Sequence, residues 1–239
     1  MRGFRAFGQV RSLRMLIAMA VLTAQSAWPS SWSGGNGVWS SDGSPGWNGT
    51  GVPNGQGAIA SFTTGGTVTN DVGNVTIGTY SLTAGNNSTR STITGVVSSV
   101  TFDQDGAGSG SATFVNSALQ AGDRLYIGAG TIILADNLVI SNNSLCSGTY
   151  SMGSSAGIIG TGNITLYSVT NNPDAGPISL TGGSSFTGTV FVQKGAVVWT
   201  SSGLGGSSAN AVFLGSSGNG SATIISTGSG DAMNNNITV

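Results

Sequence analysis

Short runs in which apolar and polar residues alternate recur along the chain. Clear examples are NVTIG, SVTFD, RLYIG, NITLYS and TVFVQ. Alternation over about four to eight residues is typical of a β-strand with one buried face. No stretch after residue 30 has a helical period of convincing length, and Gly, Asn, Ser and Asp between the runs supply turns. The pattern therefore predicts an all-β protein.

The spacing of these runs helps to choose between two β architectures. An apolar-x-apolar pattern recurs at intervals of roughly 25 residues, which matches one turn of a solenoid, whose repeats span about 20 to 50 residues. We predict a right-handed parallel β-helix, with a β-sandwich as the alternative. The first series of evenly spaced pairs is Val75/Ile77, Val100/Phe102, Leu125/Ile127 and Tyr150/Met152, and a second, less even series is Ile164/Leu166, Val190/Val192 and Val212/Leu214.

The composition agrees with an ordered solenoid. Charged residues make up 6% of the chain, against about 25% in ordinary soluble domains. Glycine, at 41 of 239 residues, could indicate disorder, but disordered chains are rich in charge and poor in aliphatic residues, and this chain is the reverse. In a solenoid each coil stacks its Val, Ile and Leu residues on those of the next coil, so little charge is needed.

The N-terminus has the layout of a secretory signal. Four arginines between Arg2 and Arg14 precede the apolar run Met15 to Ala24, and small residues follow. The run has ten residues, whereas a membrane-spanning helix needs about 20. We therefore expect cleavage between Ala24 and Ala27 and no permanent membrane span.

Removal of the signal makes the chain acidic. Three basic residues then stand against eight aspartates, a net charge of −5, and so few cations cannot neutralise many phosphates, which argues against nucleic acid as a partner. The sequence has no Glu and no His, and Cys146 is its single cysteine. This cysteine is predicted to be a small apolar filler, with a reactive thiol as the alternative.

Three segments resemble bacterial passenger proteins with autotransporter-associated β-strand repeats. Residues 32–62 have spaced tryptophans, a proline and an Ala-x-x-Phe strand, and GIIGTGNITLYS and ISLTGGSSFTGTVFVQKGAVVW resemble the repeat itself. A stretch with Pro173 and Pro177 separates the two halves of this repeat, and SSFTGTV replaces its threonine-rich run. The resemblance implies a parallel β-helix displayed at or released from the cell surface. The matching positions are Gly160, Gly162, Ile164, Leu166, Phe186, Thr187, Gly188, Val190, Val192, Gly195, Val197 and Val198.

We expect three regions: a signal peptide (1–26), a Trp/Gly-rich N-terminal cap (27–62) and β-helix repeats (63–239) that are truncated at the C-terminus. Four of the five tryptophans, Trp28, Trp32, Trp39 and Trp47, lie in this cap. Their bulk suits a cap over the first coil. The alternative is a platform on which sugars stack.

Candidate catalytic groups are few. Gly153 to Gly157 spells the G-x-S-x-G motif of a hydrolase with Ser155 as nucleophile, but a chain without histidine lacks its usual base. Lys194 and the pair Asp123–Arg124 are interpreted as ordinary turn residues. A zinc cluster cannot be built without His and with one Cys.

A pair of aspartates offers the remaining chemistry. Asp103 and Asp105 could act as paired carboxylates of a glycosidase, and Asp-Gln-Asp-Gly begins like a calcium loop. The later ligands and the closing Glu of such a loop are missing, so a turn is the favoured interpretation. We assign no catalytic, cofactor-binding or metal-binding residue from the sequence.

The sequence thus favours a secreted or cell-surface, outer-membrane-associated protein without enzymatic activity, acting as a structural protein or adhesin. Its expected partner is a host or matrix surface polysaccharide or protein. The alternatives are a β-helix polysaccharide lyase or hydrolase and a calcium-dependent surface-layer module. An enzyme needs converging carboxylates, so the test is whether Asp103, Asp105, Asp123 and Asp136 lie together.

The signal-peptide assignment predicts that the signal is cleaved from the chain during export. Secreted material should begin between Gln25 and Trp28 when its N-terminus is sequenced, because the arginine-rich start and the short apolar run direct export and processing. Intact Met1 in a cytoplasmic pool would contradict the assignment.

Overall fold

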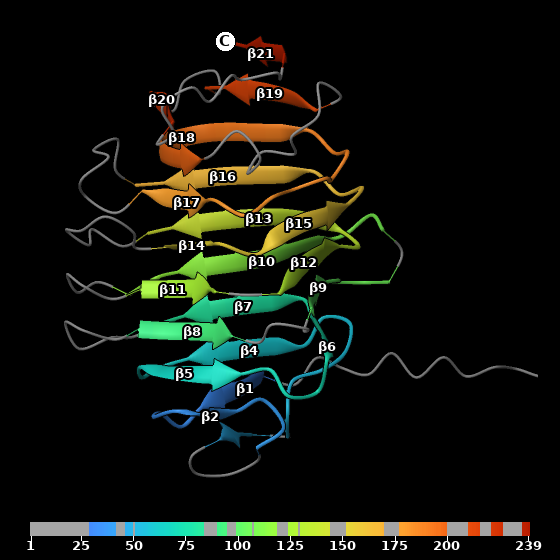
Figure 1. Cartoon of the computed structure of the whole chain (residues 1–239), viewed down its shortest axis with the longest axis vertical. Coiled ribbons are helices and arrows are strands. Elements are labelled where there is room, and N and C mark those ends of the chain that lie inside the picture. The colour runs from blue at the N-terminus through green and yellow to red at the C-terminus, as the bar shows by residue number, and fades with distance from the viewer. Residues whose placement is uncertain are drawn as a thin grey trace, which may run out of the picture.

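The computed structural model is an all-β solenoid of stacked parallel strands (Figure 1). It describes residues 29–239 except 42–45, 50, 84–89, 95–98, 107, 119–123, 129, 144–151, 170–176, 200–209, 216–220 and 227–235. The expected signal peptide and Trp28 lie outside the described residues. In the part of the chain that is described, there is no helix with the length and apolar character to cross a membrane.

Sheet A runs the length of the solenoid and contributes one strand to each coil. Successive strands pair in parallel, from β1 with β4 to β19 with β21. At the N-terminal end, β3 (Trp47–Asn48) folds back antiparallel on β1. The strands of sheet A are β1 (Pro29–Trp32), β4 (Ile59–Phe62), β7 (Thr79–Leu82), β10 (Ser111–Asn116), β13 (Asn137–Asn142), β16 (Ile164–Ser168), the first half of β18 (Val190–Trp199), β19 (Ala211–Leu214) and β21 (Asn236–Thr238).

Sheets B and C form the other faces. Sheet B holds the second strand of each coil, and β18 passes from sheet A into sheet B at Gly195, whose φ of 89° favours glycine. The strands of sheet B are β2 (Gly37–Val38), β5 (Gly66–Thr69), β8 (Arg90–Thr94), β11 (Arg124–Ile127), β14 (Met152–Ser154), β17 (Ile178–Leu180), the second half of β18 and β20 (Ala222–Ser226). Sheet C contains β6 (Asn74–Ile77), β9 (Ser99–Phe102), β12 (Thr131–Leu134) and β15 (Gly157–Gly160).

This topology confirms the predicted parallel β-helix. All pairs between successive coils are parallel in the described strands, and the single antiparallel pair is β1 with β3. The β-sandwich alternative is wrong, because a sandwich of this kind is built from antiparallel strands.

One of the two predicted spacing series describes neighbouring coils. Ile164 faces Val190, and Val190 faces Val212, so both intervals of this second series are true coil lengths. The first series is only partly right. Val75 does face Val100, but Val100 then faces Ile132 in sheet C.

The first series changes face after Val100. Leu125 lies in sheet B, where it faces Met152, so the step from Val100 to Leu125 leads to a different side of the solenoid. Tyr150, the partner of Met152 in this series, lies outside the described residues.

The series fails because the coils differ in length. Thr79 faces Ile59 of the preceding coil and Thr113 of the following one. The step from Thr79 to Thr113 is 34 positions in the sequence, and the step from Ile59 to Thr79 is little more than half as long. A fixed period therefore cannot follow the chain through the N-terminal coils.

The core is a stack of inward-facing side chains. In sheet A one row of in-register positions is buried from β4 to β18. The predicted burial of Ile164, Leu166, Val190 and Val192 is confirmed. The members of this row are Ala60, Tyr80, Phe114, Ile140, Leu166 and Val192.

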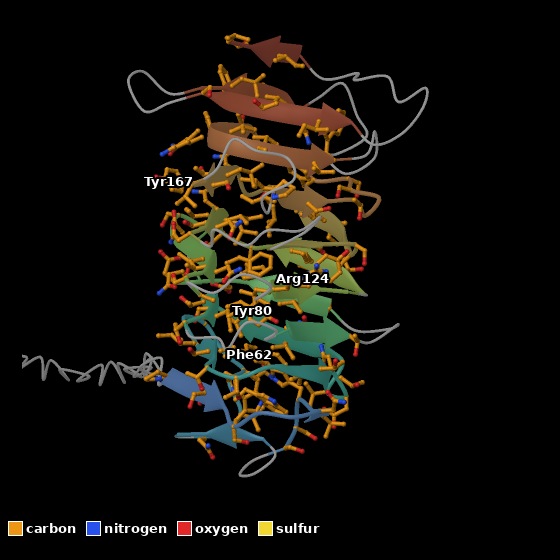
Figure 2. All side chains as sticks on the ribbon, turned by 90° about the vertical axis from the view of Figure 1, so that its left-hand side faces the viewer. Phe62, Tyr80, Arg124 and Tyr167 are labelled. Carbon is orange, nitrogen blue, oxygen red and sulfur yellow. The ribbon has the colours of Figure 1, made fainter. Side chains whose placement is uncertain are left out.

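Aromatic rings fill the N-terminal end of this core. Trp32, Trp39 and Trp47 are fully buried, and Trp47 contacts the two other indoles with centroid distances of 5.2 and 4.8 Å. Trp47 also packs on Phe62, and Phe62 meets the ring of Tyr80 edge to face. Figure 2 shows Phe62 and Tyr80 within the column of side chains. These three tryptophans thus close the core and offer no ring face to a sugar.

Buried and exposed residues alternate at the start of β18, which predicts that substitutions at neighbouring positions differ sharply in their effect on stability. Val192→Asp should lower the free energy of unfolding by about 4 kcal/mol or more, because an unpaired carboxylate would enter the apolar stack. Gln193→Asp is the control, since Gln193 is exposed on the same strand, and it should change stability by less than about 0.5 kcal/mol. Equal denaturation midpoints for the two variants would contradict the assigned register.

The burial of Tyr80 predicts an additional loss of stability at alkaline pH. Its hydroxyl is buried without a hydrogen-bond partner, and burial raises its pKa well above 10. Above pH 10 the phenol of the unfolded chain ionises while the buried phenol stays neutral, so the free energy of unfolding is unaffected by this group below pH 10 and falls as the pH rises above 10. Tyr80→Phe removes an unsatisfied group, so it should be as stable as the wild type or more stable by about 1 kcal/mol. Denaturant titrations at pH 8 and pH 11 should show a smaller loss of stability for Tyr80→Phe.

Candidate functional site: an acidic cluster between two coils

The acidic cluster lies at the corner where sheet C leads into sheet A. The length of this corner differs from coil to coil. It consists of Gly78 alone between β6 and β7, and of the short segment 135–136 between β12 and β13. Between β9 and β10 it is the segment 103–110. This longer segment, which we call the 103–110 loop, is an insertion at a corner that other coils turn tightly.

Three aspartates meet at this corner. Asp103 and Asp105 come from the 103–110 loop, and Asp136 comes from the equivalent corner of the next coil. One oxygen from each carboxylate lies within 4.8 Å of the other two. Asp105 is exposed, Asp103 is partly exposed and Asp136 is only 1% exposed. The cluster therefore opens to solvent on one side and has a buried carboxylate at its base.

Two backbone amides of the 103–110 loop bind the Asp136 carboxylate. Oδ2 of Asp136 accepts hydrogen bonds from the amides of Gln104 (2.6 Å) and Asp105 (3.2 Å). Oδ1 of Asp136 is buried and has no hydrogen-bond partner. A buried polar atom without a partner is rare in folded proteins and calls for a water, an ion or a functional explanation.

The turn expected at Asp-Gln-Asp-Gly is present. Oδ1 of Asp103 accepts a hydrogen bond from the Gly106 amide at 2.7 Å, and Gly106 has a φ of 71°. Oδ2 of Asp103 lies 3.4 Å from the Gln56 amide nitrogen, which donates to it. The turn prediction is confirmed, and the turn also places the carboxylates of Asp103 and Asp105 beside that of Asp136.

Small residues leave room beside the carboxylates. A Cβ atom on Gly110 would lie 3.0 Å from Oδ2 of both Asp105 and Asp136. The Ser109 hydroxyl donates a hydrogen bond to Oδ2 of Asp105 at 3.4 Å. The space around the cluster is thus lined by oxygen atoms and by a glycine that has no side chain to fill it.

The close approach of three carboxylates is electrostatically unfavourable. Two unit charges 4.8 Å apart repel each other by about 3 to 4 kcal/mol at an effective dielectric constant of about 20. The hydrogen bonds of Asp103 and Asp136 come from amide groups, and neither residue forms an ion pair within the described chain. The repulsion is therefore not relieved by a basic side chain at either residue.

The sequence named these aspartates as the set whose convergence would favour an enzyme, but it did not predict whether they meet. Asp103, Asp105 and Asp136 lie together, whereas Asp123 falls outside the described residues. The signal that could have found the cluster is the corner itself: Asp103 and Asp136 each follow the last residue of a sheet C strand by one or two positions, and those two strands are paired neighbours in that sheet.

The other candidates for chemistry are scattered. The Ser155 hydroxyl donates to the Gly128 carbonyl. Arg124 begins β11, and its Nε is buried without a partner. Lys194 lies at the corner between sheets A and B, with Nζ 5.6 Å from the centroid of the Tyr167 ring. Cys146 is outside the described residues. None of these described groups joins the aspartate cluster.

A second surface feature was missed by the sequence reasoning. Phe191 and Phe213 face each other on neighbouring strands of sheet A, and their rings stack with centroids 5.4 Å apart and planes 16° apart. They are 36% and 37% exposed. The signal was an aromatic residue at the outward position of an alternating strand, where polar residues are usual. We call Phe191, Phe213, Tyr167 and Lys194 the aromatic patch.

Asp71 provides a contrast with the cluster. It accepts hydrogen bonds from the hydroxyl and the amide of Ser40, and the bond from the hydroxyl is the main reason that its pKa lies below the usual value. This carboxylate is exposed and is held by the cap segment. It is an ordinary paired surface aspartate.

No protein-family model, no curated protein and no solved structure matches the chain. The resemblance to autotransporter-associated repeats therefore stays a prediction.

Proposed function

We propose that the chain is an exported, non-enzymatic surface protein of the autotransporter-passenger type, and that it acts as an adhesin for a neutral polysaccharide. The signal-like N-terminus and the repeat resemblance support export and display. A solenoid suits such a role because its extended side presents the same kind of surface on coil after coil.

The aromatic patch is the observation that carries the proposal. Its two phenylalanines stack on each other on adjacent coils and remain 36% and 37% exposed, although alternation would place polar residues there. The exposed part of this stacked aromatic pair offers an apolar surface for the C–H groups of a sugar ring, and Lys194 beside Tyr167 adds a donor for hydroxyl oxygens. The net charge of −5 expected after signal removal disfavours acidic polymers, so a neutral polysaccharide is the better fit.

The enzyme alternative has less support. Asp103, Asp105 and Asp136 do converge, as an enzyme would require, but Asp136 is buried, and the Asp103 and Asp105 oxygens lie within 4.8 Å of each other. Glycosidases hold their two carboxyl groups farther apart, at about 5 to 5.5 Å or at about 6.5 to 9.5 Å. A lyase needs a base near the scissile sugar, but Lys194 lies on β18 at a different corner of the solenoid from the cluster. These placements favour binding over turnover.

The proposal predicts selective loss of binding. Wild-type protein should bind neutral polysaccharides such as β-glucan, xylan or mannan in affinity electrophoresis. The double variant Phe191→Ser/Phe213→Ser should bind at least tenfold more weakly, which corresponds to about 1.4 kcal/mol, because the stacking surface is removed. Its melting curve should stay close to that of the wild type, since both side chains are exposed.

Ile159→Ser is the matched control. Ile159 is 38% exposed in sheet C, so the change removes a comparable exposed apolar side chain from another face. It should leave binding unchanged. Equal losses in both variants, binding to proteins alone, or release of unsaturated products or new reducing ends from pectin or alginate would contradict the proposal.

A further inference from the structure

We propose that Asp103, Asp105 and Asp136 form a calcium-binding site that joins two successive coils. The site lies beyond the proposed adhesin function and does not depend on it. Its two independent supports are the convergence of three carboxylates within 4.8 Å and the buried, unpartnered Oδ1 of Asp136.

The donor set selects a hard cation. The groups that can donate an electron pair at the cluster are oxygens: three carboxylates and the hydroxyl of Ser109, which lies beside Asp105. Oxygen-only sites suit Ca²⁺, Mg²⁺ or Mn²⁺, while nitrogen and sulfur ligands would be needed to favour zinc or copper.

Calcium fits the geometry better than magnesium. Ca²⁺ holds six to eight oxygens at about 2.3 to 2.6 Å, so oxygens on opposite sides of one ion are about 4.6 to 5.2 Å apart. A spread of up to 4.8 Å is within this range without movement of the backbone. Mg²⁺ demands a near-ideal octahedron at about 2.0 to 2.1 Å, so its opposite oxygens are only about 4.0 to 4.2 Å apart, which a spread of up to 4.8 Å fits less well.

An ion at this position would complete the local hydrogen bonding. Oδ2 of Asp136 is already used by the Gln104 and Asp105 amides, so Oδ1 is the atom left for a cation. The positive charge would also offset the repulsion among the three carboxylates. Calcium would then fasten the 103–110 loop to the corner of the following coil.

Calcium titration of the full chain tests the site. After removal of metals with EDTA, calorimetry with CaCl₂ should show one saturable site, and the melting temperature should rise with calcium concentration. Asp105→Asn and Asp136→Asn should each weaken binding at least tenfold. The matched control is Asp71→Asn, which removes a carboxylate from outside the cluster and should leave calcium affinity unchanged. MgCl₂ should bind at least tenfold more weakly.

Several results would overturn the proposal. One is the absence of saturable binding up to roughly 10 mM calcium, about tenfold above the weakest extracellular calcium modules. Others are binding that survives both cluster variants and equal affinity for magnesium. Circular dichroism checks that each variant is folded. If Asp136→Asn unfolds, Asp105→Asn decides the outcome, because Asp105 is exposed.

Discussion

The parallel hydrogen-bond ladder between coils is the constraint on which the structure depends. It fixes each inward position directly above the equivalent position of the previous coil, so Tyr80, Phe114 and Ile140 stack in one column. A side chain in such a column is buried by its neighbours above and below as much as by its own coil. One coil alone would leave this surface exposed, and the fold is therefore stable only as a stack.

The same ladder explains where variation is permitted. Strands must keep their register, since a shift by one residue would turn the apolar row to the outside. Corners do not have to keep a register, so their lengths can differ. The 103–110 loop is much longer than the corner at Gly78. Both surface features lie outside the apolar stack: the aspartates occupy a corner, and the aromatic patch occupies outward positions of strands and the corner after them.

Much of the architecture could be predicted from the sequence because alternation reports burial directly. Ile164, Val190 and Val212 were placed on equivalent positions and do face one another. The placement of Leu125 failed, because spacing along the chain cannot distinguish a full coil from a coil plus a change of face. The acidic cluster could be asked about but not predicted for a related reason: Asp105 and Asp136 become neighbours only through a register that depends on the lengths of the preceding corners.

The unequal coils have an evolutionary consequence. The coil that runs from Thr79 to Thr113 is far longer than the one from Ile59 to Thr79, yet both deliver their strands to the same ladder. The ladder therefore accommodates corners of different lengths without loss of register. New surface chemistry can be acquired one corner at a time, and lineages can diverge in their loops until little sequence similarity is left while the winding itself persists.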